Sequence, residues 1–222
     1  MIKISSVVLV LLIAIAVSLN YKSALASSRE SKKSATNGDN DKSRWDKMYG
    51  TNDYYMGENP IDFLKEHVSL LPKGKVLDIA MGEGRNGVYL ATKGFNVVGV
   101  DISEVGLKKA HELAKRNKVK ILTKAVDLKT HKLKDNEYDV IILSYYLQRD
   151  LFPQIKNALK KGGMAVIETY SEDYLKYNPQ FKKEWTVGEN EMLEAFKGLK
   201  VVRYQNVDDG KTAYISMIVQ KK

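Results

Sequence analysis

The 222-residue sequence contains no cysteine, and its three histidines lie far apart. The absence of cysteine excludes disulfide scaffolds, thiolate metal sites and cysteine nucleophiles. His67, His111 and His131 lack the short ligand spacing of zinc motifs such as H-E-x-x-H, so no metal site is expected. The sequence thus excludes chemistry by a thiol side chain of the protein itself, and it contains no pattern for a metal centre.

Negative charge is also in short supply, because 36 Lys and Arg residues face 27 Asp and Glu residues, a formal net charge of +9. A basic surface can attract nucleic acid or anionic lipid, and it can equally serve solubility. The lysine-rich stretch 108–120 has little aromatic interleaving and is typical of the solvent-facing side of a helix. No nucleic-acid groove is therefore expected. With 44% hydrophobic residues, the chain is long enough for one globular domain.

Residues 1–26 have the three-part pattern of a secretory signal: a positive start, an apolar run over 7–19, and small residues at 24–26. The run is shorter than the ~20 residues that span a bilayer, which favours a cleaved signal and export to the periplasm or the medium. Cationic residues after the run leave a second possibility open, a membrane anchor through residues 4–19 with the domain facing the cytoplasm. Residues 27–42, rich in Ser, Lys, Asn, Asp and Gly, are predicted to form a flexible linker.

Strand and helix patterns alternate through the predicted domain, residues 43–222. Strands are predicted at 75–79, 96–100, 119–126, 138–143, 164–169, 200–205 and 212–220, with helices around 61–71, 87–93, 107–114, 151–159 and 189–196. Such alternation is typical of a parallel sheet with right-handed crossovers. Asp209-Gly210 is a hairpin signal between the last two strands. We therefore predict an α/β fold: a seven-stranded, mostly parallel sheet with an antiparallel C-terminal strand and helices on both faces.

A glycine-rich turn follows the first strand. Residues 82–87 match G-x-G-x-x-G between a strand and a helix, and Asp101 ends the next strand about 20 residues later. This spacing alone fits a dinucleotide, so an NAD-linked oxidoreductase is one alternative. A pyrophosphate, however, would lie against this turn and be repelled by Glu83 and Asp78. S-adenosylmethionine carries a sulfonium and an ammonium, and its ribose hydroxyls suit Asp101, so the charges favour it as the cofactor.

The turn and its surroundings resemble a known family. Residues 76–86 read V-L-D-I-A-M-G-E-G-R-N and are followed by V-D-I-S at 100–103. This combination resembles the class I S-adenosylmethionine-dependent methyltransferases, which have a Rossmann-like fold. More narrowly it resembles their tellurite-resistance-type (thiopurine/tellurite methyltransferase-like) branch, whose turn commonly reads G-x-G-R-N. Trp45 and Tyr49 are similar to that branch's W-x-x-x-Y motif. Ala80-Met81 departs from the Gly-Cys of many relatives.

The resemblance implies a set of cofactor-binding residues. Asp78 would order the turn near the cofactor's ammonium, Gly82 and Gly84 would allow close backbone approach, and Asp101 would accept hydrogen bonds from both ribose hydroxyls. Further contacts are implied at Glu83, Arg85, Asn86, Ile102, Asp127, Leu128 and Ser144. Asp127 could instead be a helix or turn cap, a position that Asp favours anyway. The aromatic residues of 45–55 would form either a lid over the cofactor or a helix docked on the sheet.

The methyl acceptor is expected to meet the segment after the fourth strand. Methyl transfer from a sulfonium mainly requires alignment and exclusion of water, and it requires a base only if the acceptor loses a proton. Tyr145 and Arg149 are the candidate catalytic residues, and Arg149 could hold an anionic acceptor or cap the next helix.

The expected partner of this segment is a small-molecule acceptor such as a chalcogen oxyanion or a thiol. The segment does not read Asn-Pro-Pro-Tyr, the motif of many exocyclic-amine methyltransferases. The predicted leader leaves a further alternative, an exported, non-catalytic ligand-binding protein with the same fold, because little methyl donor exists outside cells. The sequence leaves the oligomeric state open.

Overall fold

The computed structural model describes residues 41–222, so the predicted leader and all but the end of the predicted linker lie outside the described residues. That end, residues 41 and 42, is helical. The chain divides into two compact units, Met1–Arg44 and Trp45–Lys222, and the second unit contains the whole sheet. Within residues 41–222, no helix combines the length and the hydropathy that crossing a membrane would require.

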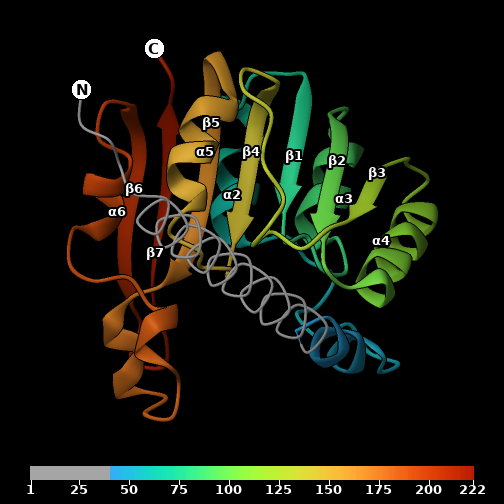
Figure 1. Cartoon of the computed structure of the whole chain (residues 1–222), viewed down its shortest axis with the longest axis horizontal. Helices are drawn as coiled ribbons and strands as arrows, with labels where there is room; N and C mark the ends of the chain where they lie inside the picture. Colours follow the sequence, from blue (N-terminus) through green and yellow to red (C-terminus); the bar gives the residue numbers. More distant parts are fainter. Residues whose placement is uncertain (1–40) are drawn as a thin grey trace, which may run out of the picture. The chain divides into compact units, whose positions relative to one another are not determined.

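A seven-stranded sheet organises the second unit, with strand order β3-β2-β1-β4-β5-β7-β6 (Figure 1). The strands are β1 (Lys75–Ile79), β2 (Asn96–Asp101), β3 (Leu122–Ala125), β4 (Tyr138–Ser144), β5 (Leu159–Tyr170), β6 (Lys200–Asp208) and β7 (Ala213–Gln220). The first five strands pair in parallel, whereas β7 lies between β5 and β6 and is antiparallel to both. The predicted sheet, including its antiparallel last strand, is confirmed.

Helices cover both faces of this sheet (Figure 1). Side chains of α2 (Asp62–His67), α3 (Arg85–Thr92) and α4 (Glu104–Arg116) form one hydrophobic cluster with the sheet. Side chains of α5 (Leu151–Ala158) and α6 (Glu191–Ala195) form a second cluster on the opposite face. Three short 3-10 helices, η1 (Val68–Leu70), η2 (Glu172–Lys176) and η3 (Lys183–Trp185), are also present.

The central strand β4 shows why the sheet is buried on both sides. Its residues Val140 and Ile142 pack with α2, α3 and α4, while Ile141 and Leu143 pack with α5, and all four are buried. A run of apolar residues without polar alternation is typical of a parallel strand covered on both faces. The parallel strands β1, β2, β4 and β5 therefore end together at one edge of a rigid layer, here called the carboxyl edge.

Several predicted boundaries differ from the structure by a few residues, and two of them have a clear local cause. The third strand was predicted over 119–126 but is confined to Leu122–Ala125, because Lys118 adopts a positive φ of 57° and Val119 still donates to the carbonyl of Ala114 in α4. Helix α5 ends at Ala158, and β5 begins at Leu159, which pairs with Tyr138. The pairing then shifts register before Met164, and Gly162 adopts a φ of 80° in this stretch.

Substitution of Leu77 by Ala tests the buried layer. Leu77 is 1% exposed in β1, whereas Leu122 on the edge strand β3 is 70% exposed. We expect Leu77→Ala to lower the free energy of unfolding by about 2–5 kcal/mol, because it removes buried methyl groups and leaves a cavity. Leu122→Ala is the matched control and should change the free energy of unfolding by less than about 0.5 kcal/mol. Urea denaturation followed by circular dichroism measures both, and equal losses would contradict the described layering.

Candidate cofactor and acceptor site

The turn between β1 and α3 is fixed by a carboxylate from the neighbouring strand. Asp101, the last residue of β2, accepts hydrogen bonds from the amides of Gly82 (2.8 Å) and Ser103 (2.8 Å). Gly82 and Gly84 have φ values of 53° and 87°, in the left-handed region that favours glycine. A Cβ on Gly82 would lie 2.7 Å from the Tyr49 hydroxyl. The turn thus needs glycine both for its backbone and for close packing.

Asp78 in β1 is a buried acid with an unused oxygen. The residue is 1% exposed, and its Oδ2 atom has no hydrogen-bond partner among the described residues. Burial and the nearby Asp101 raise the pKa of Asp78 to about 7, against the opposing effects of the Gly87 amide and Arg85. An unsatisfied buried carboxylate oxygen is costly and calls for a donor or a cation. The predicted ammonium group of the cofactor fits this requirement.

Asn86 joins three elements beneath the turn. Its Nδ2 donates to the Ser144 hydroxyl (2.8 Å) at the end of β4, and its Oδ1 accepts from the Ile61 amide (3.0 Å) just before α2. Two residues predicted for the cofactor site, Asn86 and Ser144, are thus in contact with each other. Because Asn86 is buried, this contact fixes the distance between α3 and the end of β4.

The charge of Glu83 is neutralised within the protein. Its Oε1 lies 2.5 Å from the Lys109 ammonium of α4, and its Oε2 accepts from the Tyr55 amide (2.6 Å). Both partners of the ion pair are largely buried, with side chains 12% (Lys109) and 3% (Glu83) exposed. The predicted repulsion of a pyrophosphate by Glu83 is corrected accordingly, because a paired carboxylate presents no net charge to a ligand. Asp78 and Asp101 carry that electrostatic preference instead.

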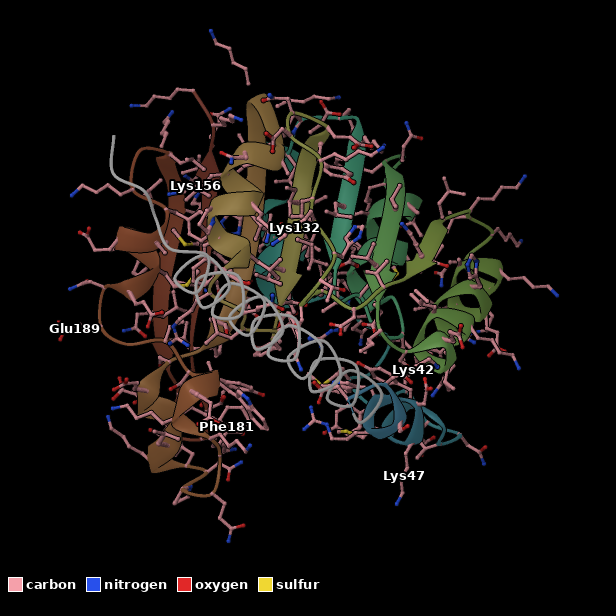
Figure 2. All side chains as sticks on the ribbon, in the orientation of Figure 1. Lys42, Lys47, Lys132, Lys156, Phe181 and Glu189 are labelled. Carbon is pink, nitrogen blue, oxygen red and sulfur yellow. The ribbon has the colours of Figure 1, made fainter. Side chains whose placement is uncertain are left out.

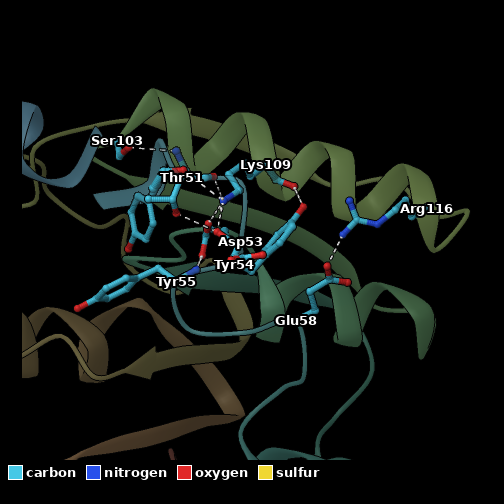
Figure 3. A network of polar contacts seen from close by, with 11 residues as sticks. Thr51, Asp53, Tyr54, Tyr55, Glu58, Ser103, Lys109 and Arg116 are labelled. Carbon is cyan, nitrogen blue, oxygen red and sulfur yellow. Dashed lines mark hydrogen bonds and ion pairs between the residues drawn. The ribbon is translucent and has the colours of Figure 1, made fainter. Parts of the chain in front are cut away.

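Lys109 also holds the N-terminal segment, defined as residues 45–58 (Figure 3). Its ammonium donates to the carbonyls of Tyr49 (3.2 Å), Thr51 (3.1 Å) and Asp53 (2.7 Å) and lies 4.6 Å from the Tyr54 ring centroid. The Tyr54 hydroxyl donates in turn to the Lys109 carbonyl (2.9 Å). This network fastens the N-terminal segment to α4.

The N-terminal segment lies directly on the glycine turn. A Cβ added to Gly106 at the start of α4 would meet the Tyr49 ring at 2.8 Å, so Tyr49 packs against both Gly82 and Gly106. Asp46 accepts a hydrogen bond from the Ser103 hydroxyl (2.6 Å), and Trp45 stacks on Tyr49 with ring centroids 5.4 Å apart. The segment thus covers the turn and the end of β2, as a lid would.

The predicted adenine-side residues are brought near Asp101. The amide of Val126 donates to the Asp101 carbonyl (2.8 Å), which places residues 126–128 beside Ile102. Asp127 itself caps a turn, since its Oδ1 accepts from the Lys129 amide (2.9 Å). Leu128 is buried in the cluster on the α5 face. The turn-cap alternative for Asp127 therefore describes its contacts in this structure.

Tyr145 lies at the carboxyl edge beside a buried acid. It has a φ of 54°, unusual for a residue with a side chain, and its amide donates to the Glu168 carbonyl (2.8 Å). Its side chain hydrogen-bonds the Glu168 carboxylate, which also accepts from the Ser216 hydroxyl (2.7 Å). Burial raises the pKa of both Tyr145 and Glu168. Glu168 was not among the candidate catalytic residues, although its place near the end of the fifth strand predicts a polar wall of the acceptor pocket there.

An aromatic series leads away from Tyr145. Its ring centroid lies 4.8 Å from Tyr170, which stacks on Tyr174 at 4.1 Å. Phe181 contacts both Tyr170 and Tyr174, and Trp185 lies 5.5 Å from Phe181. Figure 2 labels Phe181 among the short helical turns between β5 and α6. These rings form a small core that holds residues 171–190 against the carboxyl edge.

Arg149 has partners that give it a structural role. Its Nε and Nη2 atoms donate to the Glu191 carboxylate (2.6 and 3.1 Å), and its Nη1 and Nη2 atoms donate to the carbonyls of Glu184 (3.1 Å) and Thr186 (2.9 Å). These bonds tie the end of β4 to the connection before α6. The predicted role of Arg149 in holding an anionic acceptor gains no support from them. Within residues 41–222, no cluster of three or more His, Asp or Glu residues is arranged to hold a metal.

Lys109→Met tests the buried ion pair. The substitution leaves the Glu83 carboxylate buried without its partner, so we expect the free energy of unfolding to fall by about 3–5 kcal/mol. The double substitution Lys109→Met with Glu83→Gln should recover much of this loss, because no charge is then left unpaired. Lys108→Met, on the exposed side of the same helix, is the control. Urea denaturation measures all four proteins, and a Lys109→Met protein as stable as the control would contradict the role of the pair.

Comparison with known proteins agrees with this geometry. The family described as "Tellurite resistance protein TehB" matches residues 44–213 of the chain. The probable S-adenosyl-L-methionine-dependent methyltransferase TehB of Haemophilus influenzae is 26% identical over 167 residues, which cover 67% of this chain and 57% of that protein. The chain thus spans somewhat more than half the length of this curated relative. The relative's description agrees with the cofactor predicted here and confirms it at the level of the family.

Solved structures show the same fold. The crystal structure of TehB from H. influenzae aligns with a TM-score of 0.63 at 22% identity, over 72% of this chain and 62% of that one. N-methyltransferase NodS from Bradyrhizobium japonicum, solved with S-adenosyl-L-homocysteine, aligns with a TM-score of 0.64 at 16% identity, over 81% of this chain and 97% of that one. The predicted class I methyltransferase fold is confirmed. Because the family match takes in nearly all of the sheet and its helices, the chain belongs to the TehB tellurite resistance protein family.

Proposed function

We propose that the chain is an S-adenosylmethionine-dependent methyltransferase acting on a small nucleophile such as a chalcogen oxyanion or a thiol. The observation that carries the proposal is the pair of buried carboxylates, Asp78 and Asp101, on either side of the Gly82 turn. They provide negative charge where a cationic nucleoside cofactor would lie and a diphosphate would be repelled. The family of the chain supports the same cofactor.

The residues present fit this cofactor. The two Asp101 oxygens accept backbone hydrogen bonds from Gly82, Ser103 and Ile102, and a carboxylate has about four acceptor sites, which leaves acceptor capacity for a ribose hydroxyl. The unpartnered Oδ2 of Asp78 is suited to the ammonium group. Gly82 adopts a left-handed backbone, and its lack of a side chain allows close approach to the turn. Glu83 would act indirectly, by linking the turn to Lys109 and the N-terminal segment.

When bound, S-adenosylmethionine would supply an activated methyl group, whose carbon–sulfur bond breaks as the acceptor's lone pair forms the new bond, the electron pair staying on a neutral thioether. The chain's task is then alignment and exclusion of water. The N-terminal segment covers the turn and excludes solvent there. For a thiol acceptor, which must lose a proton, the Tyr145–Glu168 pair can take that proton onto a carboxylate oxygen of Glu168, because burial raises its pKa.

The two alternatives from the sequence are less well supported. An NAD-linked oxidoreductase would place a pyrophosphate beside the buried Asp78 and Asp101, and the relatives named above are methyltransferases. A non-catalytic, exported binding protein depends on the leader, residues 1–26, for which export stays a prediction. The first test of the proposed function is therefore which of the two cofactors the protein binds.

Calorimetry with S-adenosylhomocysteine and with NAD tests the cofactor. We expect the purified protein to bind the thioether and to show no heat of binding with NAD, because the buried carboxylates disfavour the diphosphate. Incubation with labelled methyl donor and selenite, tellurite, thiols or small amines then identifies the acceptor. Binding of NAD without binding of the thioether would refute the proposal, and binding of the thioether without turnover of any acceptor would favour the non-catalytic alternative.

The affinity for S-adenosylhomocysteine should depend on the charge of Asp78. With a pKa near 7, this acid is mostly protonated at pH 6 and mostly ionised at pH 8. The cofactor's ammonium favours the ionised form, so binding releases a proton, and affinity should rise by about tenfold from pH 6 to pH 8 and then level off. Asp78→Asn should bind with a flat pH profile, whereas the exposed control Asp135→Asn should keep the wild-type profile. Calorimetry at pH 6 to 8 measures these affinities. If the affinity of Asp78→Asn rose with pH as that of wild type does, Asp78 would not be the group that binds the ammonium.

A further inference from the structure

Arg85 differs from Arg149 in the number of its partners. It is the first residue of α3, and its Nη1 atom donates to the Met56 carbonyl (3.1 Å). Its guanidinium lies 5.7 Å from the Tyr145 ring centroid. Among residues 41–222, the Met56 carbonyl is its only hydrogen-bond partner, and no ion pair is formed. An arginine carries five donors in a planar fork, so most donors of Arg85 are unused, whereas those of Arg149 are largely taken.

Several residues near Arg85 belong to the ends of β4 and β5, where the methyl acceptor is expected to bind. Its charge acts on Tyr145 at the end of β4 and on Glu168 and Tyr170 at the end of β5, lowering the pKa of each against the effect of burial. In the sheet, β4 and β5 lie on the opposite side of β1 from β2, which ends in Asp101. The charge of Arg85 also lowers the pKa of Asp78 and Tyr49, so its guanidinium lies between the cofactor-side acid of β1 and the acceptor-side residues of β4 and β5.

Glu168, the acidic residue of this cluster, already has hydrogen-bond partners. Glu168 accepts from the Ser216 hydroxyl (2.7 Å) and hydrogen-bonds the side chain of Tyr145. Burial raises its pKa, while the hydrogen bonds from Ser216 and Tyr145 and the charge of Arg85 lower it. No salt bridge joins Glu168 to Arg85 among the described residues. The guanidinium thus keeps its positive charge without a carboxylate partner, in aromatic surroundings where charge-assisted hydrogen bonds are strong.

We infer that Arg85 is a specificity-determining residue that binds the anionic group of the methyl acceptor, an inorganic oxyanion or a carboxylate, with Tyr145 and Tyr170 beside it. The inference rests on the proposed function, and it moves Arg85 from the cofactor contacts predicted by resemblance to the acceptor. A planar fork with free donors matches two oxygens of an oxyanion or a carboxylate. A neutral thiol gains nothing from it, so Arg85 would select by charge.

Substitutions of Arg85 test this inference in the full chain. We expect Arg85→Gln to raise the KM for selenite or for a carboxylated thiol by about 10- to 100-fold, the effect of losing hydrogen bonds to a charged group. Arg85→Lys, which keeps the charge and loses the fork, should recover part of this loss. The KM for a neutral thiol and the dissociation constant for S-adenosylhomocysteine should stay within about twofold of wild type. Arg203→Gln, on the exposed strand β6, is the matched control.

Binding measurements separate this inference from the proposed function. Calorimetric titration of the S-adenosylhomocysteine-loaded protein with selenite, and separately with a carboxylated thiol, gives acceptor affinity without turnover and shows which anion source is bound. The inference is confirmed if either anion binds to wild type and binds more weakly to Arg85→Gln by the factor given above. It is overturned if neither anion binds, or if Arg85→Gln binds it as wild type does. It is also overturned if Arg85→Gln loses affinity for S-adenosylhomocysteine, because Arg85 would then belong to the cofactor. Failure of the thioether to bind wild type would instead refute the proposed function.

Discussion

Two hydrogen bonds to one carboxylate hold the candidate site together. By accepting from Gly82 and Ser103, Asp101 ties the turn before α3 to the start of α4. Ser103 then caps α4 by accepting from the Gly106 amide (3.0 Å) and donates to Asp46 of the N-terminal segment. The glycine turn, the helix cap and the covering segment therefore share one anchor at the end of β2. Buried, charge-assisted bonds of this kind are among the stronger ones in proteins, which suits an anchor on which several elements depend.

Charge is distributed unevenly along the carboxyl edge. Asp78 and Asp101 are buried at the ends of β1 and β2, while the guanidinium of Arg85 lies 5.7 Å from the ring centroid of Tyr145 after β4. In the proposed reaction a cationic donor meets an anionic acceptor, so each reactant would find the opposite charge on its own side of β1. The Glu83–Lys109 ion pair does not contribute to this uneven distribution of charge, because its two charges cancel each other beneath the N-terminal segment. In the proposed reaction this arrangement aligns the two reactants by charge.

The sequence predicted the sheet well because its signals are local. Apolar runs such as that of β4, the glycine turn and the Ser103 cap are each readable within a few residues. Contacts between distant residues were not readable. Lys109 belongs to a stretch that looks solvent-facing, yet it binds carbonyls more than 50 positions earlier. Arg85 and Arg149 are chemically alike, and only the fold shows that Glu191 and two distant carbonyls engage Arg149. Periodicity cannot reveal which donors are satisfied.

The aromatic series from Tyr145 to Trp185 also has an optical consequence. Tyrosines in contact with one another pass excitation energy to a nearby tryptophan, and Trp185 ends this series at the surface, 38% exposed. The other tryptophan, Trp45, stacks on Tyr49 above the glycine turn. The two tryptophans of the chain therefore lie on different sides of the proposed reaction path, Trp45 on the donor side and Trp185 on the acceptor side.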